Sequence, residues 1–181
     1  MAKTLSTMAP LGMSISNGLL LDPTKDQTKK LSDFIQANKP TLIAFISNHC
    51  PFVKHIKKAF IELSHRYMDK VTFIAINSND VINYPEDHPN KMPQENYPFS
   101  YLFDESQELA KAFMAACTPD FFLFDKEGKL IYRGQFDESR PSNDITPSGK
   151  DLELAIEAAL NGKLPNEKQT PSIGCNIKWK E

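Results

Sequence analysis

Two continuous apolar runs mark the expected centre of the fold. Residues 41–47 read TLIAFIS and residues 71–77 read VTFIAIN, with no alternation between apolar and polar positions. Runs of this length are typical of strands buried on both faces, as in a parallel sheet. We therefore expect both runs to be buried strands of the same sheet.

Residues 51–68, between these runs, have the spacing of an amphipathic helix. Phe52, Ile56, Phe60 and Leu63 recur on one side, and Pro51 suits the first turn. Strand, helix and strand then form a βαβ unit, whose crossover we expect to be right-handed.

The same reading of hydrophobic periodicity covers the remaining chain. It predicts a short strand in 13–21 around an Asn17-Gly18 turn signal, short helices in 28–38 and 105–116, a hairpin of strands 120–125 and 130–134, a polar loop over 135–149, and a final amphipathic helix over 150–161. The tail, residues 162–181, has no clear period.

Residues 78–100 are expected to be irregular, because four prolines fall within them. A short helix near 90–96 is compatible with the pattern. Loops of this length often serve a function. A variable surface insertion explains the segment equally well, and both readings stay open here.

Together the elements predict an α/β chain: a central mixed sheet flanked by helices on both faces, with an N-terminal β extension. We expect residues 1–181 to form a single domain, with 162–181 as its C-terminal tail. The first buried strand ends just before Cys50. In open α/β sheets chemistry gathers at the carboxyl ends of such strands.

Charge and composition narrow the classes of partner. The 21 basic and 23 acidic residues give a net charge of −2, and 40% of the residues are hydrophobic. This balance does not favour binding to nucleic acid or to an anionic membrane surface. No apolar segment approaches the ~20 residues of a membrane span, and the N-terminus lacks the apolar stretch of a secretory signal. We expect a soluble, cytoplasmic protein.

Three cysteines carry the candidate chemistry: Cys50, Cys117 and Cys175. Cys50 lies in SNHCPFVKH, between a buried strand and a helix start. Unpaired backbone N–H groups and the helix dipole favour the thiolate there, and the thiolate is the nucleophilic form. Two alternatives stay open: an inert buried thiol, or a metal site made by His49, Cys50 and His55.

The motifs around these cysteines resemble the thioredoxin fold. Cys50-Pro51-Phe52-Val53 stands where thioredoxins carry CxxC, with Val53 in place of the second cysteine. Thr118-Pro119 in CTPDFFLFD is similar to the cis-proline loop that faces that motif, so the resemblance implies a cis bond before Pro119.

The stretches NHCPFVKH, CTPDFFLFD and PSIGCNIKWK are most similar to the peroxiredoxin-like branch, which is related to alkyl hydroperoxide reductase and thiol-specific antioxidant proteins. One departure matters. The peroxidatic cysteine of a true peroxiredoxin would fall at Val53, its threonine at Cys50 and its proline at Ile46. The peroxidase motif PxxxTxxC is therefore missing.

The resemblance implies a thiol–disulfide oxidoreductase of antioxidant type that needs no cofactor and no metal. Cys50 is the expected nucleophile, and Cys117 or Cys175 releases it from a mixed disulfide. Pro51, Phe52, Thr118 and Pro119 are expected to contact the substrate, a protein or small-molecule disulfide or thiol. Arg133 and Arg140 are weaker candidates for stabilising the thiolate.

Two other functions remain as alternatives. One is a peroxiredoxin-like peroxide reductase, and the other is a non-catalytic binding module, with or without a metal. The sequence names neither the reducing partner nor the choice between monomer and homodimer.

Overall fold

The computed structural model describes residues 3–181 and places the two apolar runs side by side in a seven-stranded sheet. They form β4 (Thr41–Phe45) and β5 (Thr72–Asn77), which pair in parallel. The other strands are β2 (Leu19–Asp22), β3 (Gln27–Lys30), β6 (Ser100–Phe103), β8 (Asp120–Phe124) and β9 (Leu130–Gly134), in the order β3-β2-β6-β5-β4-β8-β9. Because β6 is parallel to β5 and β8 is antiparallel to β4, the sheet is mixed, as predicted.

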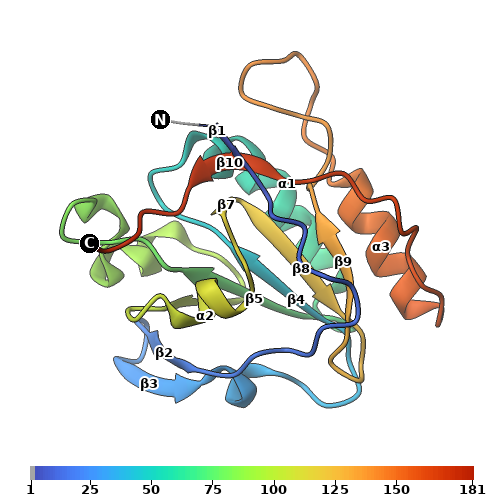
Figure 1. Ribbon diagram of the computed structural model, residues 1–181, viewed down its shortest axis with the longest axis horizontal. Coiled ribbons are helices and arrows are strands. Elements are labelled where there is room, and N and C mark those ends of the chain that lie inside the picture. The colour runs from blue at the N-terminus through green and yellow to red at the C-terminus, as the bar shows by residue number, and fades with distance from the viewer. Residues whose placement is uncertain (1–2) are drawn as a thin grey trace.

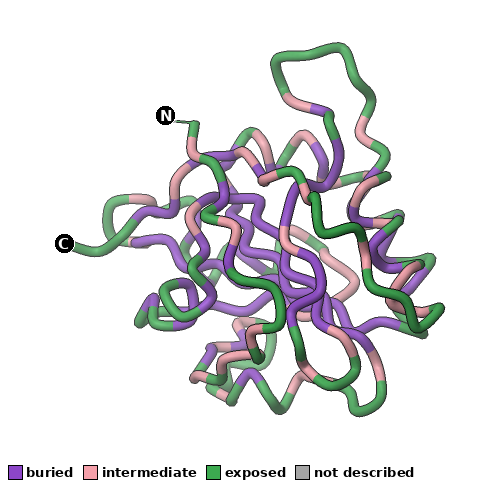
Figure 2. Tube along the Cα trace, turned by 45° about the vertical axis from the view of Figure 1, so that its right-hand side comes forward, coloured by how far each residue is buried: buried purple, intermediate pink, exposed green. Residues whose placement is uncertain are grey.

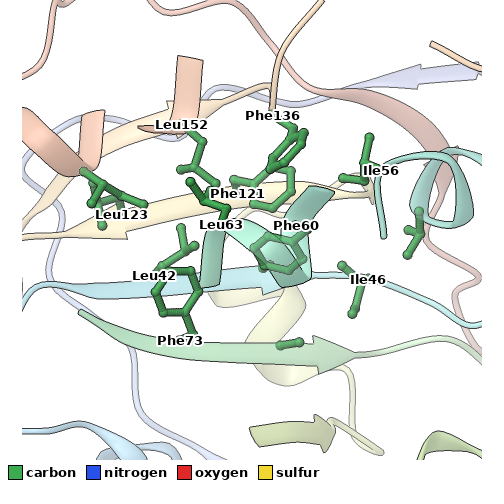
Figure 3. Close-up of a cluster of buried hydrophobic side chains, with 14 of the residues drawn as sticks. Leu42, Ile46, Ile56, Phe60, Leu63, Phe73, Phe121, Leu123, Phe136 and Leu152 are labelled. Atoms are coloured by element: carbon green, nitrogen blue, oxygen red, sulfur yellow. The ribbon is translucent and has the colours of Figure 1, made fainter. Parts of the chain in front are cut away.

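Helices cover both faces of this sheet, which confirms the predicted α/β architecture. Helices α1 (Pro51–Tyr67) and α3 (Lys150–Leu160) pack on the face that Leu42 and Ala44 present. Figure 3 shows this core, with Phe60 of α1 among Phe73 and Phe121 of the strands. The opposite face, with Ile43 and Phe45, is covered by the short helix α2 (Glu108–Ala112) and the 3₁₀ helix η1 (Leu31–Phe34).

A second, three-stranded sheet joins both ends of the chain to its middle. Its order is β1 (Lys3–Leu5), β10 (Ile173–Asn176) and β7 (Cys117–Thr118), all antiparallel. In Figure 1 the red strand β10 runs past the start of α1, between β1 and β7. The tail, which has no clear sequence period, therefore reaches the end of the sheet where Cys50 lies.

The N-terminal predictions were partly wrong. The strand expected in 13–21 begins only at Leu19, and Asn17 lies ahead of it, where its side chain accepts hydrogen bonds from the N–H groups of Gly18 and Ser32. The helix expected over 28–38 is β3 followed by the single turn η1. Pairing of β3 with β2 outweighs the helical spacing of the apolar residues there.

The elements later in the chain agree better with their predicted positions and differ mainly at their ends. The hairpin β8–β9 and helix α3 are confirmed, whereas α2 is shorter than the predicted helix over 105–116. Residues with left-handed φ bound it, Gln107 at 63° and Met114 at 57°. Within 78–100, the 3₁₀ helices η2 (Pro85–Asp87) and η3 (Pro89–Glu95) include the expected short helix.

Burial follows the layers of the fold. In Figure 2 the central strands are buried, and the loop after β9 projects outward, with residues 141–146 exposed. Among residues 3–181 no helix is long and apolar enough to cross a membrane.

Candidate active site

Cys50 is the N-cap residue of α1, directly after the turn that follows β4. Its backbone is extended (φ −69°, ψ 122°), Pro51 occupies the first turn, and the Cys50 carbonyl accepts the N–H of Lys54 at 3.0 Å. The side chain is 0% exposed. The predicted placement at a strand end and helix start is therefore confirmed, and the thiol is fully enclosed.

Cys175 is the nearest thiol to Cys50. The two Sγ atoms lie 3.0 Å apart, and Cys50 Sγ also lies 3.1 Å from the carbonyl oxygen of Thr118. A disulfide bond would bring the sulfurs to about 2.05 Å, so the structure holds two free thiols in hydrogen-bond contact.

This contact polarises the pair. The thiol of Cys175, as a hydrogen-bond donor, is the main influence that lowers the pKa of Cys50. Burial opposes the shift, whereas the Thr118 side chain and the N–H of Val53 add to it. The same contact, together with burial, raises the pKa of Cys175. The contact therefore favours the thiolate form at Cys50 and the thiol form at Cys175.

Strand pairing places Cys175 in this position. Across β10 and β7, Cys175 is the register partner of Thr118. The two backbones approach so closely at Gly174 that an added Cβ would lie 2.0 Å from the Thr118 carbonyl oxygen. Glycine is therefore required there.

The peptide bond between Thr118 and Pro119 is cis, as the resemblance implied. Pro119, Phe52 and Ile173 help to line a small hollow of about 20 Å³, roughly the space of one water molecule, and neither Cys50 nor Cys175 is among its lining residues. Pro51 is exposed, Phe52 is half-buried, and Thr118 is buried with its hydroxyl 3.3 Å from Ser47 Oγ. Of the predicted substrate contacts, only Pro51 and Phe52 present appreciable surface.

Cys117 faces away from this pair. It is buried, its Sγ lies 3.5 Å from the Pro119 carbonyl oxygen, and burial raises its pKa. Adjacent residues of a strand point to opposite sides, so the Cys117 side chain lies on the other face of β7 from that of Thr118, and its Sγ makes no hydrogen bond to Cys50. Of the two predicted resolving cysteines, the structure brings only Cys175 to Cys50.

A buried carboxylate anchors the residue before Cys50. Asp87 Oδ2 lies 2.5 Å from His49 Nδ1, and Asp87 Oδ1 accepts the N–H of Asn48 at 2.7 Å. The bond to Asp87 raises the pKa of His49. Burial tends to raise the pKa of Asp87, but its bonds to His49 and Asn79 more than offset this and lower it. The His49 ring stacks on Tyr84.

The metal alternative gains no support from this geometry. His49 is committed to Asp87, and in the part of the chain that the structure describes, no three His, Cys, Asp or Glu side chains gather into a group that could hold a metal ion.

The two arginines considered for stabilising the Cys50 thiolate make hydrogen bonds to other groups. Arg133 donates to the carbonyl of Ala9 and to Gln169. Arg140 donates to the carbonyls of Asp137 and Ser139 and to the side chain of Gln135. Neither has a bond to Cys50.

Asp120 is a second buried carboxyl near the site. It follows Pro119, is 0% exposed, and burial raises its pKa to about 7. Its Oδ1 lacks a hydrogen-bond partner among the described residues. Sequence reasoning missed both this aspartate and Asp87. The position of Asp87 in the proline-rich segment was the one available signal, and nothing in the sequence paired it with His49.

The sequence of this chain matches a known protein family. A family model described as the AhpC/TSA family matches residues 18–133. No curated protein matches the sequence.

Solved structures match over nearly the whole chain. An uncharacterized conserved protein from Geobacillus kaustophilus is 47% identical, with a TM-score of 0.94, covering 99% of this chain and 97% of that one. A hypothetical protein from Sinorhizobium meliloti is 42% identical, with a TM-score of 0.92 and 98% coverage of each chain. A candidate thiol:disulfide interchange protein DsbE from Chlorobium tepidum is 21% identical (TM-score 0.65; 83% and 98% covered) and shares the fold alone.

Proposed function

Because the chain belongs to the AhpC/TSA family, we propose that it is a thiol–disulfide oxidoreductase with Cys50 as nucleophile and Cys175 as resolving cysteine. The contact between the two sulfurs at 3.0 Å carries this proposal. It supplies both a polarised thiolate and a second thiol within reach of any mixed disulfide.

The reaction balances with these two thiols alone. The Cys50 thiolate attacks one sulfur of a substrate disulfide, forms a mixed disulfide and expels the other sulfur as a thiolate, which takes a proton. Cys175 then loses its proton and attacks Cys50 Sγ, releasing the second substrate thiol. Two electrons have passed to the substrate, and an external dithiol must reduce the Cys50–Cys175 disulfide to close the cycle.

The burial of both thiols limits the size of the substrates that can react with them. Cys50 is 0% exposed and Cys175 is 2% exposed, so the surrounding chain must move before a substrate reaches either sulfur. A small disulfide needs a smaller displacement than a protein disulfide does. We therefore expect small disulfides to react faster than protein disulfides.

Turnover of hydroxyethyl disulfide with dithiothreitol as the reductant tests the proposal. We expect catalysis by the wild-type protein and loss of catalysis in Cys50→Ala. With hydroxyethyl disulfide alone and no dithiothreitol, Cys175→Ala should retain a mixed disulfide on Cys50. Cys117→Ala is the matched control, because Cys117 is equally buried, and should stay within about twofold of wild type. A wild-type rate no greater than that of Cys50→Ala would refute the proposal.

A second candidate oxidant is a peroxide. The enclosure of Cys50 favours a compact oxidant, although Ile46, Cys50 and Val53 stand where the peroxidase motif would be. The thiolate would attack the peroxide oxygen, releasing water or an alcohol and forming a sulfenic acid. Cys175 would then displace water to give the same disulfide. A reaction with hydrogen peroxide no faster than that of free cysteine excludes this candidate.

A further inference from the structure

The segment between β5 and η3 makes one continuous hydrogen-bond bridge between the two cysteine-bearing segments. Asp87 is 0% exposed and Asn79 is 2% exposed. Neither residue touches the sulfur atoms. Both bind the backbone that carries those atoms.

On the Cys50 side, Asp87 fixes the turn ahead of α1. Its Oδ1 accepts the N–H groups of Asn48 at 2.7 Å and His49 at 3.4 Å, and its Oδ2 lies 2.5 Å from His49 Nδ1. Tyr101 donates to Asn48 Oδ1 at 2.8 Å. The two residues that precede Cys50 are therefore held through both their main chains and their side chains.

On the Cys175 side, Asn79 fixes the chain just beyond β10. Its Oδ1 accepts the N–H of Lys178 at 2.9 Å, and its Nδ2 donates to Asp87 Oδ2 at 2.7 Å. Asp80 strengthens this anchor, because its N–H donates to the Lys178 carbonyl at 2.8 Å. The same carboxylate thus binds the turn before Cys50 and, through one amide, the segment after Cys175.

We propose that Asp87 and Asn79 are positioning residues of the dithiol site, which hold the Cys50 turn and the Cys175 strand in the register that brings their sulfurs into contact. This inference rests on the sulfur contact itself and would stand even if the pair had a different substrate. It gives the proline-rich segment 78–100 a role that its composition left open.

The amide of Asn79 allows a test without changing any charge. Asn79→Ala removes the two hydrogen bonds by which the amide joins Asp87 to Lys178. It leaves in place the titratable and charged groups around Cys50: Cys175 on β10, Cys117 on β7, His49 before α1, its partner Asp87 in η2, and Lys178 beyond β10. A change in the titration of Cys50 then reports on the position of the Cys175 thiol. Loss of that donor raises the pKa of Cys50.

The experiment follows the ultraviolet absorbance of the Cys50 thiolate against pH in the reduced, full-length protein. We expect Asn79→Ala to raise the titration midpoint by about one pH unit. The control is Asn17→Ala, which likewise changes no charge and removes an amide that joins two segments: the Asn17 Oδ1 accepts the N–H groups of Gly18 and Ser32, away from both cysteine segments. Its midpoint should match wild type.

A midpoint in folded Asn79→Ala equal to that of wild type would overturn the inference. If Asn79→Ala does not fold, Asn79→Ser is the second variant, because its shorter side chain cannot reach both Asp87 and Lys178 and the substitution changes no charge. A raised midpoint in Asn79→Ser supports the bridge, and an unchanged or lowered one overturns it. The readout needs no disulfide and no substrate, so it is independent of the turnover assay above.

Discussion

At the scale of single residues, the site depends on an asymmetry between two sulfur atoms. Hydrogen bonds from the Cys175 thiol and from backbone N–H groups lower the pKa of Cys50. The pKa of Cys175 is raised, because its own thiolate would lie beside the negative charge of Cys50. In the proposed mechanism this contact between the two sulfur atoms gives two chemically identical side chains different roles. Cys117 is equally buried but has no such donor, and burial raises its pKa.

Cys175→Ala should raise the pKa of Cys50, which the intact site lowers to about 6. The wild-type thiolate is present above that pH and is lost as the pH falls through it. Alanine removes the largest stabilising bond, so the titration should move toward the ordinary cysteine range near 8.5. Thiolate absorbance measures the change, and identical curves for the two proteins would contradict the assigned roles.

Asp120→Asn should stabilise the protein at high pH. The folded pKa of about 7 lies above the unfolded value near 3.9, so burial of this carboxyl carries no charge penalty below about pH 4, where it is protonated in both states. The cost grows as the pH rises through this window and is complete above pH 7. We expect a gain on the order of 2–4 kcal/mol at about pH 8 and little change near pH 4.

Urea unfolding at both pH values measures this difference in the free energy of unfolding. An equal effect at the two pH values would show that the carboxyl does not titrate in that window.

At the scale of elements, the short strand β10 has more influence on the site than its length suggests. It pairs with β1 on one side and β7 on the other, and it places Cys175 against the fully buried Cys50. Only the absence of a side chain at Gly174 lets it lie against Thr118.

Gly174→Ala should displace β10 and separate the two sulfurs. Overpacking of this kind typically costs about 1–3 kcal/mol, and we expect disulfide formation with diamide to slow by tenfold or more. Gly162→Ala is the control, because Gly162 (φ 67°) has nothing within 4 Å and lies away from the site. Equal rates of disulfide formation in the two variants would contradict the role of β10.

The long elements could be predicted from sequence and the short ones could not. Strands β4 and β5 and helix α1 carry their own hydrophobic signal over five residues or more. Strands β7 and β10 have two and four residues, and their pairing is a long-range contact that leaves no local pattern. Because this pairing leaves no local pattern, the sequence could not decide whether Cys117 or Cys175 is the resolving cysteine. The structure separates them by the position of the tail, which lies beside Cys50.

At the scale of the whole molecule, the cysteine pair would link parts of the chain 125 residues apart. A bond between them would tie the first βαβ unit to the C-terminal tail. Oxidation state should therefore change global stability and not only the local site.

The oxidised protein should be more stable than the reduced one. Closing a loop of this length restricts the unfolded chain by about 4–5 kcal/mol in the chain-entropy account. Thermal unfolding with and without dithiothreitol measures the difference. Cys50→Ala, which cannot form the bond, should show none. An oxidised wild-type protein that melts below the reduced one would mean that the bond strains the fold.

Peptide mapping of diamide-treated protein by mass spectrometry without reductant tests the central claim most directly. The account predicts a disulfide between Cys50 and Cys175, with Cys117 recovered as a free thiol. A Cys50–Cys117 disulfide, or complete recovery of three free thiols, would contradict it.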